Sequence, residues 1–147
     1  MKTLSRLTPL LFLALLLTGC GDSGSDDPSP DAATFRVEWQ QTGEYAKFNK
    51  IITIRGGVFY KSGTQEEMPT ILFDEDLEGA TSSYEAEGVR EMGIESTIGI
   101  SPVADVPAEM QIKINIFRNG KLLDENTYTY TEQSDAVQTK LTYKAND

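Results

Sequence analysis

The side chains of this sequence that could do chemistry are mainly carboxylates. The 147-residue chain holds 23 Asp and Glu, no His and one Cys, and its formal net charge is −10 at pH 7. This composition excludes a Ser/His/Asp or Cys/His catalytic unit, a Cys/His zinc site and an internal disulfide. Because the negative charge repels phosphate backbones, we expect no nucleic-acid partner.

Paired carboxylates remain as a possible acid and base set, since a glycosidase needs only two acids across a cleft. A single small domain rarely offers a deep cleft, and 23 acids produce pairs by chance. We therefore expect a protein that is not an enzyme and that uses no cofactor.

The sharpest pattern of carboxylates resembles a twelve-residue calcium loop with a glycine, Gly79, at position 6. The acids at its positions 1, 3, 5 and 12 are Asp74, Asp76, Glu78 and Glu85. Calcium takes roughly six to eight oxygens, which such acids supply. Two features oppose this interpretation: position 5 is Glu instead of the shorter Asp or Asn, and the residues before the loop favour a strand where that family has a helix. An acidic loop between strands is the alternative, and we assign no metal site on the pattern alone.

The only cysteine, Cys20, follows a segment typical of a signal peptide. The positively charged Lys2 and Arg6 precede the stretch 7–17, which is apolar except at Thr8 and Pro9 and is about half of the ~20 residues that a transmembrane helix needs. The end of this segment resembles the lipobox of bacterial lipoproteins in the tetrad Leu17-Thr18-Gly19-Cys20. The resemblance implies that residues 1–19 are removed and that the thiol of Cys20 carries a lipid, which would anchor the protein in a membrane.

Residues 20–33 contain no large apolar side chain and predict a flexible acidic tether. The cluster Asp22, Asp26 and Asp27 is similar to the export signal of surface lipoproteins in Bacteroidetes. That similarity implies an outer-membrane location in the bacterial envelope, periplasmic or surface-exposed. A plain acidic linker is the alternative.

From residue 34 onward, apolar residues recur mainly at every second position, the period of half-buried strands. The clearest stripe is Met110-Ile112-Ile114-Ile116. Two others are Phe35-Val37-Trp39, and Phe48-Ile52-Ile54 with Lys50 between them. Short strands separated by turns are typical of antiparallel sandwiches. We predict an all-β fold for residues 34–147, an immunoglobulin-like antiparallel β-sandwich of roughly seven to nine short strands.

The dipeptide Asn119-Gly120 predicts a two-residue hairpin turn, because both residues tolerate positive φ. If this register continues, Tyr128 and Tyr130 share the outer face of the sheet with Phe117 and form an exposed patch suited to binding a partner. Alternatively, a bulge near residues 124–126 turns the two tyrosines into the core.

Three functions remain compatible with the sequence. We favour a tethered, non-catalytic module that binds a protein or glycan, because the tether gives reach and a sandwich presents loops for binding. A structural component of an envelope assembly and a calcium-binding domain using residues 74–85 are the alternatives. The expected partners are the membrane, through the lipid on Cys20, and a protein or glycan of unknown identity.

Overall fold

The computed structural model describes residues 31–146 apart from 78 and 135, so the predicted lipid site at Cys20 lies outside the described residues. Within the described part the chain forms eight strands and two short 3-10 helices. The strands are β1 (Ala33–Gly43), β2 (Phe48–Arg55), β3 (Tyr60–Lys61), β4 (Thr81–Val89), β5 (Glu91–Ile100), β6 (Glu109–Arg118), β7 (Lys121–Thr131) and β8 (Val137–Lys144). The helices are η1 (Tyr45–Lys47) and η2 (Asp74–Leu77). No helix in this part is long and apolar enough to cross a membrane.

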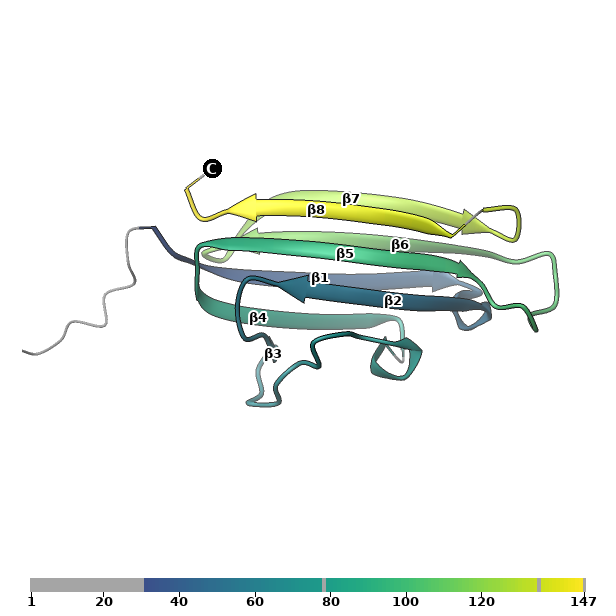
Figure 1. Cartoon of the computed structure of the whole chain (residues 1–147), viewed down its shortest axis with the longest axis horizontal. Helices are drawn as coiled ribbons and strands as arrows, with labels where there is room; N and C mark the ends of the chain where they lie inside the picture. The colour runs from purple at the N-terminus through teal and green to yellow at the C-terminus, as the bar shows by residue number, and fades with distance from the viewer. Residues whose placement is uncertain (1–30, 78, 135, 147) are drawn as a thin grey trace, which may run out of the picture.

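The strands form two antiparallel sheets that lie face to face, with the strands along the long axis of the molecule (Figure 1). One sheet has the order β3-β4-β1-β6-β7 and the other has the order β2-β5-β8. β1 runs from the end where the described chain begins to the opposite end, which carries η2 and the loop after β5 (Figure 1). The predicted all-β sandwich, with its number of strands, is confirmed.

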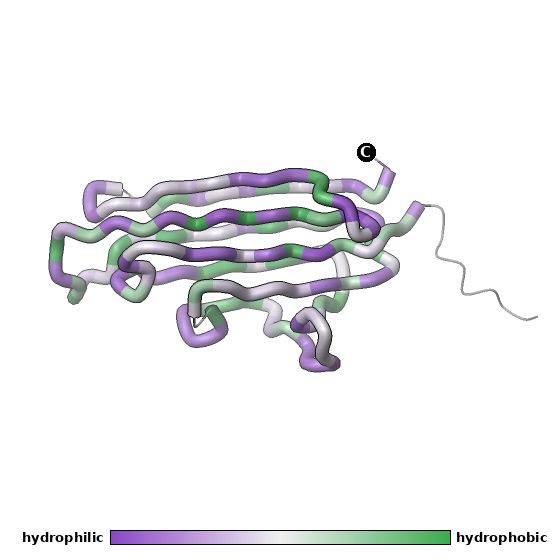
Figure 2. Tube along the Cα trace, turned by 180° about the vertical axis from the view of Figure 1, so that it is seen from behind, coloured by the Kyte–Doolittle hydropathy of each residue, from purple (hydrophilic) through white to green (hydrophobic). Residues whose placement is uncertain are grey.

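Alternation of apolar and polar residues produces the two packed layers. Along β1, every second residue from Ala33 to Gln41 is buried, and the same alternation is visible on the other long strands (Figure 2). The inner faces supply the fully buried side chains, among them Phe35, Ile94 and Ile112, each at 0% or 1% exposure. Burial of these two facing stripes is the main source of stability for a chain that has no disulfide.

The hairpin between β6 and β7 begins as expected. Asn119 and Gly120 have φ values of 51° and 76°, and Phe117 pairs with Leu122. The register then shifts, because Ile116 pairs with Asp124 and Leu123 is left as an extra residue. The prediction that the two-residue register continues is therefore wrong beyond Phe117, and the interpretation with a bulge is confirmed.

The bulge separates the three residues of the predicted binding patch. Tyr130 pairs with Met110 and is 1% exposed, and Tyr128 is half-buried against the core. Phe117 lies on the outer face of the sheet, where the guanidinium carbon of Arg36 stands 4.0 Å from the centre of its ring. The prediction of a single exposed patch was thus wrong, since a shift of one residue exchanges the two faces of a strand.

The same bulge places polar residues of β7 against β8, the edge strand of the other sheet. The hydroxyl of Tyr143 donates to Oδ2 of Asp124 at 2.7 Å, and the amide of Asn126 donates to the same oxygen at 2.9 Å. We call these three residues the seam. It joins the free edges of the two sheets through a single carboxylate.

The seam changes the acidity of its members. The hydrogen bonds from Tyr143 and then from Asn126 lower the pKa of Asp124 below its ordinary value. Burial, followed by the hydrogen bond that it donates to Asp124, raises the pKa of Tyr143. The seam is thus strongest where Asp124 is ionised and Tyr143 is protonated.

We predict that the seam makes folding sensitive to acid. The unfolded state takes up a proton on Asp124 more readily than the folded state, so this stability is present above the usual Asp pKa of about 3.9 and is lost as the pH falls through the folded pKa. Asp124→Asn should lower the free energy of unfolding by about 1–2 kcal/mol at pH 7 and should change it less at pH 2–3. Denaturant melts across this range test it. Asp105→Asn, in an exposed loop, is the control, and an equal loss at both pH values would contradict the prediction.

Candidate functional site

The two aspartates at the start of the predicted calcium loop already have partners within the protein. Oδ1 of Asp74 accepts the backbone N–H of Lys50 at 2.9 Å and lies 3.1 Å from the ammonium nitrogen of that lysine. Oδ2 of Asp76 accepts the backbone N–H of Phe73 at 2.9 Å. Both carboxylates therefore serve to fold η2.

The last acid of the pattern lies elsewhere. Glu85 is on β4, where its Oε2 is 4.0 Å from Nε of Arg36, and Glu78 lies outside the described residues. Among the residues that the structure describes, no three His, Cys, Asp or Glu side chains gather closely enough to hold a metal ion. The described acids of the pattern, Asp74, Asp76 and Glu85, do not converge in the manner of a twelve-residue calcium loop, and a cation at this end would need oxygens of other kinds.

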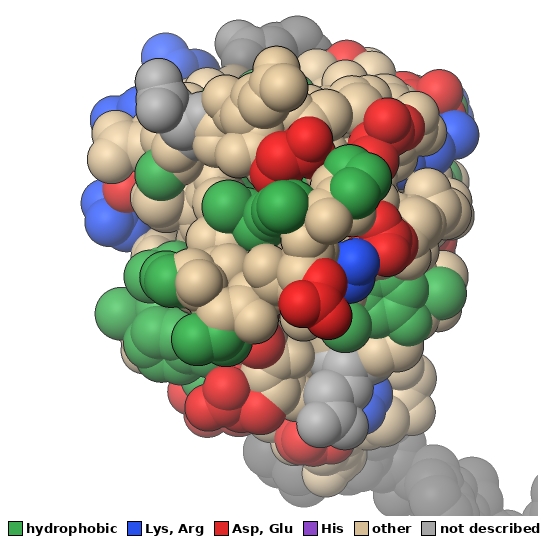
Figure 3. Space-filling view, turned by 90° about the vertical axis from the view of Figure 1, so that its right-hand side faces the viewer, with side chains coloured by type: hydrophobic (Ala, Val, Ile, Leu, Met, Phe, Trp, Pro, Cys, Tyr) green, Lys and Arg blue, Asp and Glu red, His purple; other side chains and the backbone are tan. Residues whose placement is uncertain are grey.

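A short segment closes this end of the sandwich. It comprises η2 together with Gly79 and Ala80, and we call it the cap. Leu77 is 1% exposed and fills the space between the sheets, and the carbonyl of Ala80 accepts the backbone N–H of Gln41 at 2.8 Å. Figure 3 shows acidic side chains mixed with hydrophobic ones over this end of the molecule. Two buried polar side chains, one from each sheet, hold the cap in place.

The first of these side chains is Gln41, at the end of the buried stripe of β1 and 1% exposed. Its amide nitrogen donates to the carbonyl of Leu77 at 2.6 Å and to the carbonyl of Gly79 at 2.7 Å. Its amide oxygen is buried and has no hydrogen-bond partner. Two backbone oxygens and the Gln41 amide therefore meet at one point. The oxygen of that amide is left without a hydrogen bond, which is costly in a buried position.

The second side chain is Lys50, which points inward from β2 and is 3% exposed. Its ammonium donates to the carbonyl of Tyr45 at 2.9 Å and to the carbonyl of Phe48 at 2.8 Å, and it lies 3.1 Å from Oδ1 of Asp74. Lysine is almost never buried to this extent without partners. Here three oxygens from η1, β2 and η2 satisfy its three protons.

From the sequence no role was assigned to Gln41 or Lys50, although each is a polar residue on an apolar stripe. Gln41 extends the stripe of Phe35, Val37 and Trp39, and Lys50 interrupts another stripe. A polar residue on the buried face of a strand must find partners inside the fold. The residues that supply these partners are distant in sequence, so spacing alone gave no indication of them.

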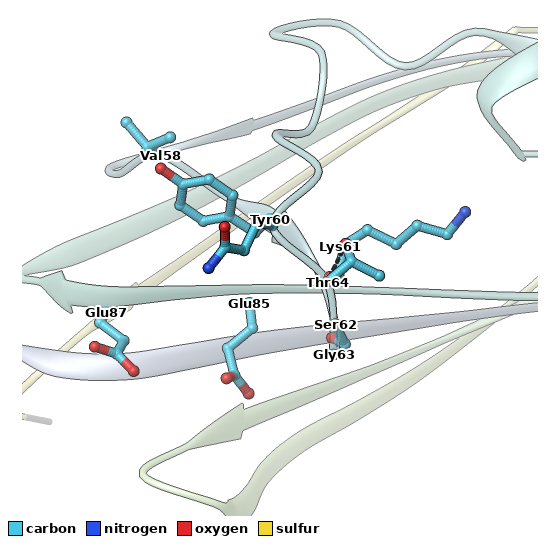
Figure 4. A pocket seen from close by; sticks show the side chains of 9 residues that line it. Val58, Tyr60, Lys61, Ser62, Gly63, Thr64, Glu85 and Glu87 are labelled. Atoms are coloured by element: carbon cyan, nitrogen blue, oxygen red, sulfur yellow. Dashed lines mark hydrogen bonds between the residues drawn. The ribbon is translucent and has the colours of Figure 1, made fainter.

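A separate groove lies beside the edge of the larger sheet, between residues 58–65 and β4. It encloses about 660 Å³. Figure 4 shows the ring of Tyr60 beside Val58, together with the carboxylates of Glu85 and Glu87 that project from β4. Tyr60 is 41% exposed and pairs with Glu85 in the sheet register. An accessible ring beside hydrogen-bonding groups is a surface suited to a ligand.

Residues 2–144 match the model of a family described as PLAT/LH2 and C2-like Ca²⁺-binding lipoprotein. No curated protein matches the sequence. The immunoglobulin-like arrangement is not confirmed, since the family description refers to PLAT/LH2 and C2-like domains.

Solved structures share the fold at low sequence identity. The calcium-bound form of a protein from Parabacteroides distasonis, solved by NMR, has a TM-score of 0.66 and 21% identity, covering 80% of this chain and 97% of that one. A crystal structure of a domain of unknown function from Bacteroides vulgatus has a TM-score of 0.61 and 12% identity, covering 77% and 94%. A crystal structure from Bacteroides ovatus gives 0.60 and 10%, covering 79% and 98%.

Identities this low establish the fold alone, whereas the family match spans nearly the whole chain. The organisms of the similar structures agree with a lipoprotein of the Bacteroidetes type. The protein is a lipid-anchored envelope protein with an all-β sandwich, and it belongs to the family of PLAT/LH2 and C2-like Ca²⁺-binding lipoproteins.

Proposed function

We propose that this lipoprotein binds calcium at the cap and acts as a lipid-anchored, non-catalytic binding module. The observation that carries the calcium proposal is the amide of Gln41, whose oxygen is buried without a partner. The family description and the calcium-bound state of the similar Parabacteroides distasonis structure support the choice of ion.

The oxygens that surround the amide of Gln41, the carbonyls of Leu77 and Gly79, suit a hard cation together with the amide oxygen, and we call this set the calcium cradle. A half-turn of the Gln41 amide would exchange its nitrogen and oxygen, so that Oε1 faces the carbonyls of Leu77 and Gly79. Three oxygens facing one another repel unless a cation lies between them. Calcium takes such oxygens, including backbone and amide carbonyls, and completes its shell with water. The carboxylates of the cap add negative potential around this point.

Because these oxygen ligands carry no charge, they also limit the affinity for calcium. Calcium affinity rises with the number of charged ligands, and the two aspartates at this end are engaged by Lys50 and by a backbone N–H. We therefore expect a dissociation constant of about 10⁻⁴–10⁻³ M, the range of extracellular modules. Such a site responds to the calcium of the cell exterior.

We predict that calorimetry finds one calcium site in this range. At about 100 times the dissociation constant, calcium should add about 2.7 kcal/mol to the free energy of unfolding. Gln41→Leu, which keeps the bulk of the side chain but lacks the oxygen, should weaken binding about tenfold or more. Gln40→Leu, the same change on the opposite face of β1, should leave binding unchanged. Saturable binding that survives in Gln41→Leu would place the ion elsewhere, and no binding up to about 10 mM calcium would end the proposal.

The second part of the proposal is the anchor. Cys20 is the only cysteine and ends a lipobox-like tetrad, and the acidic residues after it resemble an export signal to the outer membrane. We propose that Cys20 carries the lipid, that the acidic tether gives the domain reach, and that the domain does no catalysis. The absence of His from the sequence supports the last point.

Lipidation is testable in cells. Wild-type protein should take up an alkyne palmitate analogue and enter the detergent phase, whereas Cys20→Ser should do neither. Protease added to intact cells should degrade the domain if it faces outward. An unlabelled wild-type protein in the aqueous phase would contradict the anchor.

The third part concerns a protein or glycan partner, and the groove at Tyr60 is its best-formed surface. An accessible ring stacks on a sugar or an apolar side chain at low entropic cost, and the neighbouring carboxylates accept hydrogen bonds. The predicted patch of Tyr128, Tyr130 and Phe117 is not proposed again, because these residues do not share a face. A structural role in an envelope assembly is the alternative.

We predict that Tyr60→Ala reduces the capture of partners when intact cells expressing the full-length lipoprotein are crosslinked. The ring is partly exposed, so this change should alter the free energy of unfolding by only about 0.5 kcal/mol. Leu122→Ala, at a side chain 55% exposed at the other end of the sheet order, is the control. If Leu122→Ala abolishes capture and Tyr60→Ala does not, the groove is not the binding surface.

A further inference from the structure

We infer that Lys50 is a built-in cation whose ammonium fills an oxygen cage at the cap and thereby orders this end of the sandwich without a free metal ion. The cage consists of the carbonyls of Tyr45 and Phe48 and the carboxylate of Asp74, at 2.8–3.1 Å from the ammonium nitrogen. The inference concerns oxygens other than those around Gln41.

The chemistry of the cage is that of a cation site. Three oxygens from η1, β2 and η2 converge on one point, and one of them carries a negative charge. A calcium ion would require the oxygens at 2.3–2.6 Å, a contraction of about half an ångström. The same set would therefore accept a small free cation once the lysine was removed.

Burial explains why the site needs a cation. The lysine is 3% exposed, whereas the side chain of Asp74 is 47% exposed. Without the ammonium, the two carbonyls would lose donors in a place that water enters poorly, and Asp74 would keep only its backbone donor. η2 would then lose its ion pair with the smaller sheet.

The cage is also connected to the proposed calcium cradle. Asp74 and Leu77 are the two ends of η2, and three residues of 3-10 helix span only about 6 Å. By holding Asp74, Lys50 both positions the cap and keeps one carboxylate away from a calcium ion at Gln41. The effect on a calcium ion rests on the proposed function, whereas the positioning of the cap does not.

The test replaces Lys50 with Ala, which removes the ammonium and leaves the cage open. In a calcium chelator, limited proteolysis within the cap should be slow in the wild-type protein and about tenfold faster in Lys50→Ala, because cleavage follows local opening. About 10 mM calcium, or methylammonium in excess, should restore protection and raise the melting temperature of the variant.

Two further variants serve as controls. Lys50→Met fills the space with an apolar chain, so it should lose protection without being rescued by methylammonium. Any protection that calcium gives this variant comes from the proposed site at Gln41. Lys47→Ala removes a half-exposed lysine, paired with Glu44 at 2.7 Å, at the same change in charge. It should behave like the wild-type protein.

The outcomes separate this inference from the proposed function. Rescue of Lys50→Ala by methylammonium, or a rescue by calcium larger than that of Lys50→Met, supports the cage even if the wild-type protein binds no calcium. If the variant is as protected as the wild-type protein, or if neither cation rescues it, the inference is overturned, whatever calorimetry finds for Gln41. If Lys50→Ala does not fold under any condition, nitrogen-15 NMR of the wild-type protein decides: a slowly exchanging Lys50 ammonium supports the cage, and a rapidly exchanging one overturns it.

Discussion

A polar group that enters the space between the two sheets must find its partner there, because little water can follow it. This constraint governs the parts of the molecule in which the structure departs from a plain apolar sandwich. Gln41 and Lys50 reach the carbonyls and carboxylate of the cap, and Asp124 joins Tyr143 across the open edge. In each case a buried or half-buried polar side chain connects two elements that are distant in sequence. These links substitute for the disulfide that the composition excludes.

The same constraint unites the two proposals for the cap. Both Gln41 and Lys50 stand on inner faces at the end that η2 covers. The amide of Gln41 donates to the carbonyl of Leu77 in η2, and the ammonium of Lys50 pairs with the carboxylate of Asp74 in η2. One of these sites is filled by an ammonium and the other leaves an oxygen unsatisfied. This chain belongs to a family described as Ca²⁺-binding, yet the ammonium of Lys50 already neutralises part of the negative charge at the cap. Calcium would adjust an ordered cap instead of folding it.

Sequence periodicity predicted what depends on local pattern. Alternation identified the stripes of β1, β2 and β6, and Asn119-Gly120 identified the turn between β6 and β7, because both signals act over a few residues. The position of Tyr130 depended on one extra residue, Leu123, for which the sequence has no distinctive sign. The partners of Gln41 and Lys50 come from the long connection between β3 and β4 and from the loop before β2. Only the closed fold brings those segments to the inner faces.

The direction of β1 sets the distance between the cap and the start of the domain. The strand starts at Ala33, near the beginning of the described chain, and its eleventh and last residue, Gly43, lies at the end that carries the cap (Figure 1). An extended strand of this length spans about 35 Å. Under the proposed lipidation of Cys20, the strand would act as a rigid spacer between the attached end of the domain and the cap. The cap would then meet the ions of the bulk medium, beyond the roughly 10 Å over which charged lipid headgroups alter local ion concentrations.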